Sequence, residues 1–66
     1  MWTLQRGRQT AECVVWPHVF GWELRLIVGA ELLQSQVCRS NEDLITTQEQ
    51  WHSAMLEKDW QEQHAD

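Results

Sequence analysis

The chain has 66 residues, a hydrophobic content of 42% and a formal net charge of −5. This length allows one small domain, and the hydrophobic content is typical of a folded domain rather than of a disordered chain. The negative charge argues against a nucleic-acid backbone or an anionic membrane surface as the main partner, because both attract a basic face.

The beginning of the chain shows no targeting or membrane segment. Residues 1–6 contain no basic end followed by an apolar run, so we expect no secretory signal. No stretch approaches the ~20 consecutive apolar residues that a membrane-spanning helix needs. We therefore expect a cytoplasmic protein, in which Cys13 and Cys38 are reduced thiols rather than a disulfide.

The N-terminal part of the chain predicts one short strand and a long connection. Residues 2–6 alternate between large apolar and polar side chains, as in a half-buried strand. Residues 7–12 are polar and predict a loop. The apolar run at residues 13–16 stops at Pro17, which lacks the N–H that a sheet ladder needs, so it predicts an edge strand or a loop.

The clearest element is a hairpin with Gly29-Ala30 at its turn. Residues 22–28 alternate in character, a second run follows at residues 31–39, and a glycine at the first central position suits a two-residue type II′ turn. This turn predicts that Val28 pairs with Glu31, Leu26 with Leu33, Leu24 with Ser35 and Trp22 with Val37. The buried face would then carry Trp22, Leu24, Leu26, Leu33 and Val37, with Glu23 and Arg25 on the other face.

A helix follows the hairpin. Ser40 and Asp43 have the spacing of a capping box, and a core stripe at helical spacing includes Leu44, Trp51 and Met55. No glycine stops this helix, so we expect it to fray somewhere after Lys58.

The predicted fold class is α+β. A small antiparallel sheet of three strands, in β-β-β-α order, carries one C-terminal helix packed on one face. Residues 1–60 would form this single domain, and residues 61–66 would form a disordered acidic tail. An alternative has only the two-stranded hairpin and the helix, with the N-terminal segment as a loop.

A second apolar stripe on the helix is the candidate interaction surface. Ile45, Leu56 and Trp60 lie about 100° around the helix from the core stripe. A helix packed on a sheet buries one face, so these side chains would stay exposed and mark an association surface. Alternatively, the segment at residues 7–19 folds back and covers them.

Residues that could carry chemistry lack the spacing that such chemistry needs. Cys13, His18, Cys38 and His52 are zinc-ligand types, but they form no C-x-x-C or H-x-x-x-H pattern. A chain this short has little room for a substrate cleft, so we expect no catalytic residue, no cofactor, no metal and no small-molecule substrate. An aromatic group could stack on single-stranded nucleic acid, although a role in the core suits the negative charge better: Trp16, His18, Phe20 and Trp22.

About the last two thirds of the chain contain three short patterns: ELRL at residues 23–26, SQVCRS at residues 35–40, and W…AM-x-EK-x-W from Trp51 to Trp60. Together they resemble a group of very short, uncharacterised bacterial proteins. The chain departs from that group at Gly29-Ala30, where an Asn-Gly turn is expected, and at Asp59, where a glycine would end the helix. The resemblance implies a bacterial, cytoplasmic setting and brings no activity, ligand or catalytic residue.

Two functions from different classes remain open. The first is a small, non-enzymatic protein-interaction or accessory module, self-associating or binding another protein through the stripe of Ile45, Leu56 and Trp60. The second is a nucleic-acid-binding module that uses the outward sheet face and the basic residues Arg6, Arg8, Arg25 and Arg39. An enzyme is the third and weakest hypothesis.

Overall fold

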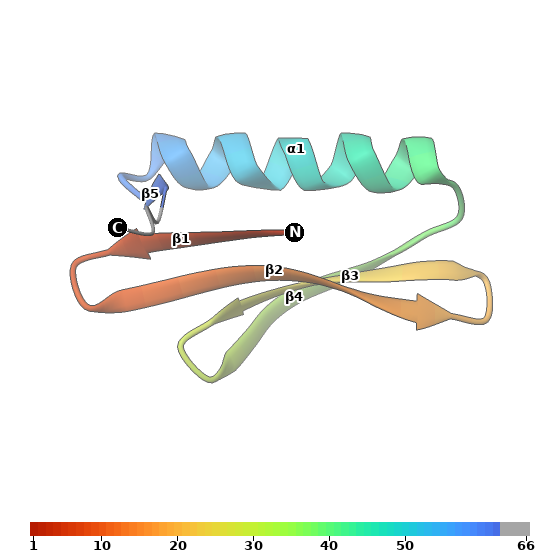
Figure 1. Ribbon diagram of the computed structural model, residues 1–66, viewed down its shortest axis with the longest axis horizontal. Helices are drawn as coiled ribbons and strands as arrows, with labels where there is room; N and C mark the ends of the chain where they lie inside the picture. The colour runs from red at the N-terminus through yellow and green to blue at the C-terminus, as the bar shows by residue number, and fades with distance from the viewer. Residues whose placement is uncertain (63–66) are drawn as a thin grey trace.

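The computed structural model describes residues 1–62. Five antiparallel strands form one sheet in the order β4-β3-β2-β1-β5, and the helix α1 lies across one face of it (Figure 1). The α+β class with one packed helix is confirmed, whereas the three-stranded sheet is wrong. The elements are β1 (Trp2–Arg6), β2 (Gln9–His18), β3 (Gly21–Val28), β4 (Glu31–Cys38), α1 (Asn41–Glu57) and β5 (Gln61–Glu62).

The central strand β2 includes the segments that the sequence predicted as loops or an edge. Cys13 pairs with Trp2 of β1 on one side and with Leu26 of β3 on the other. Pro17 is tolerated because its nitrogen faces the side of β2 on which β1 would pair, and β1 pairs with β2 only as far as Cys13. No strand of the described chain therefore needs an N–H from this proline. Beyond Cys13, β2 therefore has one open edge.

Glycines mark the three hairpin turns. Gly29 has a φ of +62° and Ala30 has no positive φ, as a type II′ turn requires. Gly21, at the start of β3, has a φ of +138°, and a Cβ added there would lie 2.4 Å from the carbonyl oxygen of Cys38. Gly21 thus permits a close approach between the beginning of β3 and the end of β4.

A β-bulge changes the register predicted for the β3–β4 hairpin. Val28 pairs with Glu31 as predicted, but the register shifts between Leu26 and Ile27. Leu26 consequently pairs with Gln34 instead of Leu33. The prediction that Leu26 is buried is confirmed, and the prediction of its cross-strand partner is wrong.

The bulge also exchanges the two faces of β4. A shift by one residue moves every following side chain to the opposite side of the sheet. Leu24 therefore pairs with Gln36 rather than Ser35, and the Gln36 amide reaches the Thr47 hydroxyl of α1, 3.5 Å away. Val37 lies on the face away from the helix and is partly exposed, so its predicted place in the buried face is wrong.

The core lies between α1 and the sheet face that the helix covers. Half-buried Leu44 and Trp51 pack against it from the helix. The buried apolar residues come from four strands, the helix and the segment that follows it: Leu4, Ala11, Cys13, Leu24, Leu26, Cys38, Met55 and Trp60. This is a thin, one-sided core, as expected for a chain of this length.

Both ends of α1 have defined caps. The Ser40 hydroxyl accepts a hydrogen bond from the Asp43 N–H at 3.0 Å, which confirms the predicted N-cap. At the other end, the N–H groups of Trp60 and Asp59 donate to the carbonyls of Met55 and Leu56, at 3.2 and 3.3 Å. This is the Schellman pattern, and Asp59 takes the left-handed position with a φ of +69°.

The turn at Asp59 carries the chain back to the sheet, where β5 adds to the edge of β1. Gln61 pairs with Gln5 and Glu62 with Leu4. Residues 61 and 62, predicted as part of a disordered tail, form a strand, and residues 63–66 of that prediction lie outside the described residues. Within residues 1–62, no helix has the length and apolar character to cross a bilayer.

Candidate interaction surfaces

The predicted stripe of Ile45, Leu56 and Trp60 is divided by the structure. Ile45 and Leu56 are 51% and 39% exposed, as expected for the flank of the helix. Trp60 is only 5% exposed, because it follows the turn at Asp59 and packs with Leu4 in the core. The expected exposure of Trp60 is wrong, and a role for Ile45 and Leu56 in association stays a prediction.

The four side chains of zinc-ligand type have other partners. His52 pairs with Glu62 at 2.5 Å and packs against the Trp2 ring, with 5.2 Å between ring centroids. His18 accepts a hydrogen bond from the Phe20 N–H across the turn, and both cysteines are buried. Within residues 1–62 no three His, Cys, Asp or Glu side chains gather in a way that could hold a metal ion.

The two cysteines are free thiols on the helix-facing side of the sheet. Cys13 and Cys38 pack around Leu24 in one part of the core. Burial raises the pKa of the Cys13 thiol from 9.0 to about 11, which keeps it protonated at neutral pH. Since the thiolate is the reactive form, Cys13 lacks the properties of a nucleophile.

The arginines proposed for nucleic-acid binding do not form one patch. Arg6 lies over the Trp60 ring on the helix side and donates to the Lys58 carbonyl at 3.1 Å, so it holds the end of α1. Arg25 lies on the opposite face of the sheet, in an ion pair with Glu23. Of the remaining two, Arg8 lies in the β1–β2 turn and Arg39 lies over the Phe20 ring, 5.6 Å from its centroid.

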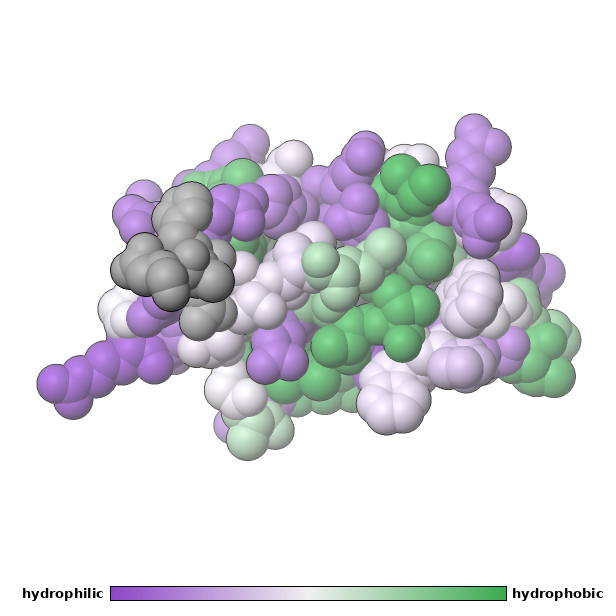
Figure 2. Space-filling model, in the orientation of Figure 1, coloured by the Kyte–Doolittle hydropathy of each residue, from purple (hydrophilic) through white to green (hydrophobic). Residues whose placement is uncertain are grey.

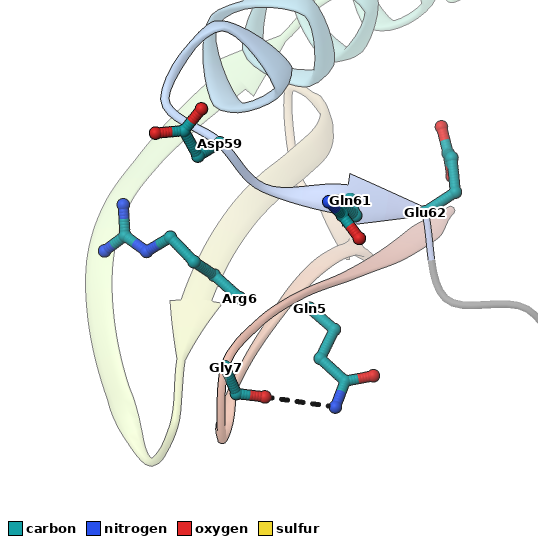
Figure 3. Close-up of a pocket in the computed structure, with 6 residues that line it drawn as sticks. All are labelled: Gln5, Arg6, Gly7, Asp59, Gln61 and Glu62. Carbon is teal, nitrogen blue, oxygen red and sulfur yellow. Dashed lines mark hydrogen bonds between the residues drawn. The ribbon is translucent and has the colours of Figure 1, made fainter.

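A polar hollow beside β1 and β5 has a volume of about 300 Å³. Figure 3 shows that Gln5, Arg6 and Glu62 point in different directions and do not converge on a common centre. Arg6 is already engaged at the helix end, and its neighbours here are exposed. The hollow therefore lacks the convergent polar groups of a small-molecule site. Its lining is Gln5, Arg6, Gly7, Asp59, Gln61 and Glu62.

The uncovered face of the sheet presents a broad apolar surface. Trp16, Leu32 and Val37 are 50%, 56% and 38% exposed on this face. They surround a central ion pair in which Arg25 and Glu23 are 2.6 Å apart. We call this surface the open face and define it by Glu12, Val14, Trp16, Glu23, Arg25, Ile27, Leu32, Ser35 and Val37.

Arg25 links the charged centre of the open face to its aromatic rim. Its guanidinium lies over the Trp16 ring, 5.1 Å from the centroid, while its Nε donates to Glu23 at 2.7 Å. These contacts hold the arginine against the sheet and pair its charge with that of Glu23.

Exposed aromatic residues gather at the end of the molecule that carries the β2–β3 turn. Phe20 and Trp22 lie at this end with Trp16. Figure 2 shows that apolar side chains run from α1 down across the sheet in this half, whereas polar ones dominate the half near β5. Patches of this kind mark association surfaces more often than isolated apolar residues do.

No model of a known protein family matches the chain, and no curated protein or solved structure matches it. The surfaces of the molecule itself are therefore the guide to its function.

Proposed function

We propose that the protein is a small, non-enzymatic interaction module that binds a protein surface through its open face. The observation that carries the proposal is the group of exposed apolar side chains, Trp16, Leu32 and Val37, around the ion pair of Arg25 and Glu23. Tryptophan and arginine are the residue types that most often dominate binding energy at protein interfaces.

The chemistry of the open face favours a protein partner over a nucleic acid. Arg25 is neutralised by Glu23 and occupies one side of the Trp16 ring. A base would have to compete for that ring, and a phosphate would meet a chain with a net charge of −5. A partly apolar protein surface would meet neither obstacle.

A matched pair of variants tests the proposal. Trp16→Gln changes the open face, and Ile45→Gln changes the helix flank at a residue of nearly equal exposure, 50% against 51%. Wild type and variants, each with a checked circular dichroism spectrum, are immobilised and used to capture proteins from bacterial cell extract for mass spectrometry. We expect one discrete protein that Trp16→Gln loses and Ile45→Gln retains.

Two results would contradict the proposal. Loss of capture with Ile45→Gln and retention with Trp16→Gln would move the binding surface to the helix flank. A mobility shift with mixed single-stranded DNA or RNA that weakens steeply with added salt would favour the nucleic-acid function instead.

A further inference from the structure

Within residues 1–62 the longest unpaired edge of the sheet is that of β4. At the other side, β5 has only two residues, Gln61 and Glu62, and the open edge of β2 beyond Cys13 contains Pro17. In contrast, β4 has eight residues, from Glu31 to Cys38, and no other strand of the described chain pairs with its outer side. An edge strand of this length is a template for pairing with another chain unless something protects it.

The direction of the free backbone groups of β4 follows from its register. Residues of an antiparallel pair alternate between hydrogen-bonded and non-hydrogen-bonded positions, and a two-residue turn is closed by a hydrogen-bonded pair, here Val28 and Glu31. Counting along β3, Leu24 is also hydrogen-bonded to β4, through its partner Gln36. Ser35 and Val37, on either side of Gln36, therefore direct their N–H and C=O groups outward.

The half of β4 away from the turn, Gln34 to Cys38, contains no charged residue or proline that would prevent pairing with another strand. The only charged residue of β4 is Glu31, at the far end beside the turn, and the strand contains no lysine, arginine or proline. The bulge bends β4 before Gln34, which leaves Gln34 to Cys38 as a regular, uncharged segment. Although the chain has a net charge of −5, this segment carries no charge, so two copies would meet little repulsion along it.

We propose that β4 pairs antiparallel with β4 of a second copy, about a twofold axis at Gln36. Ser35 of one copy would face Val37 of the other, and each of these pairs would exchange two backbone hydrogen bonds, about four in total. The two sheets would become one continuous sheet, with both helices on one side and both open faces on the other.

A second copy fits this edge because the segment is complementary to itself. At the axis Gln36 would face Gln36, and a carboxamide both donates and accepts hydrogen bonds. No charged residue would face a like charge, and twofold dimers are the commonest assemblies of soluble proteins. The dimer does not rest on the proposed function, because it uses backbone groups of β4, whereas Trp16 lies in β2.

Proline at Ser35 tests the edge directly. The N–H of Ser35 points away from β3, so Ser35→Pro removes no hydrogen bond of the β3–β4 ladder but blocks pairing with a second chain. We expect wild type to sediment as a reversible dimer and Ser35→Pro to raise its dissociation constant at least tenfold. Ser35→Thr is the matched control and should remain dimeric.

A charge pair at Gln36 tests the axis without introducing proline. Gln36→Lys and Gln36→Glu would each place like charges opposite one another in a homodimer and weaken it, while an equimolar mixture would form the heterodimer. Circular dichroism and thermal melting of each variant confirm that the monomer is folded.

Three results would overturn the proposal. Wild type could sediment as a monomer at millimolar concentration, folded Ser35→Pro could remain as dimeric as wild type, or the two Gln36 variants could fail to combine. A dimer lost with Trp16→Gln but kept with Ser35→Pro would place self-association on the open face instead.

Discussion

We predict that replacing Asp59, in the turn that follows α1, with glycine stabilises the protein. Asp59 adopts a φ of +69° at the left-handed position of the Schellman turn. An L-residue with a Cβ is strained there, whereas glycine is not. Asp59 is also a negative charge at the C-terminal end of the helix, where the dipole favours positive charge. Within residues 1–62 its carboxylate makes no ion pair or hydrogen bond that a substitution would lose.

The expected gain for Asp59→Gly is about 1 kcal/mol. The left-handed conformation costs an L-residue about 1–2 kcal/mol, at the lower end for aspartate, and the loss of conformational freedom by glycine offsets about 0.5–1 kcal/mol. Removing the charge adds about 0.3–1 kcal/mol. For a domain of this size, 1 kcal/mol corresponds to a rise in melting temperature of roughly 4–8 °C.

Two further variants separate strain from charge. Asp59→Asn removes only the charge and should gain less than Asp59→Gly, while Asp59→Ala removes the charge but keeps an unfavourable backbone and should gain nothing. Urea unfolding followed by tryptophan fluorescence, together with thermal melting, measures the order glycine, asparagine, alanine. If Asp59→Ala stabilises the protein as much as Asp59→Gly, the argument from backbone strain is refuted.

Three further predictions concern the turns, the helix cap and the buried thiol. Gly21→Ala should unfold the protein or cost more than ~3 kcal/mol, because the added Cβ would lie 2.4 Å from the backbone carbonyl oxygen of Cys38. Gly29→Ala meets open space and should cost only ~1–2 kcal/mol in urea unfolding. Equal costs for the two variants would contradict the close approach at Gly21. Ser40→Ala should cost about 1 kcal/mol in the same assay through loss of the cap, and an unchanged unfolding midpoint would show that the cap contributes nothing. Burial raises the pKa of Cys13 on folding from 9.0 to about 11, so the free energy of unfolding should be at its full value below pH 9 and fall by about 2–3 kcal/mol as the pH rises to about 11. Cys13→Ala should not show this decrease. If wild type and Cys13→Ala have the same pH profile, burial of Cys13 is not its cause.

The parts of the fold that could be predicted from the sequence have local causes. The type II′ turn needs only Gly29 between alternating strands, and the N-cap needs only Ser40 three residues before Asp43. Both signals act within a few residues, so no knowledge of the tertiary structure is required. The class of the fold followed from them.

The parts that were missed depend on distant contacts. Pro17 is acceptable in β2 only because β1 ends its pairing at Cys13, which residues near the proline do not reveal. The bulge shifts the register of β4 at Leu32 and Leu33. These two consecutive leucines break the alternation of apolar and polar residues, and this break was the signal in the sequence that could have indicated the bulge. Trp60 was placed by extending the helical period through the turn at Asp59, beyond the end of the helix.

The pairing of β1 with β5 joins segments near opposite ends of the described chain, since Leu4 lies beside Glu62. Leu4, Met55 and Trp60 share one part of the core, so that part cannot form until nearly the whole chain is available. During synthesis β1 could pair with β2, but its other side would lack β5 until residues 61 and 62 were made, and closing so long a loop slows folding. The protein should therefore fold in a single all-or-none step once residues 1–62 are available, and fragments that stop before residue 60 should remain unfolded.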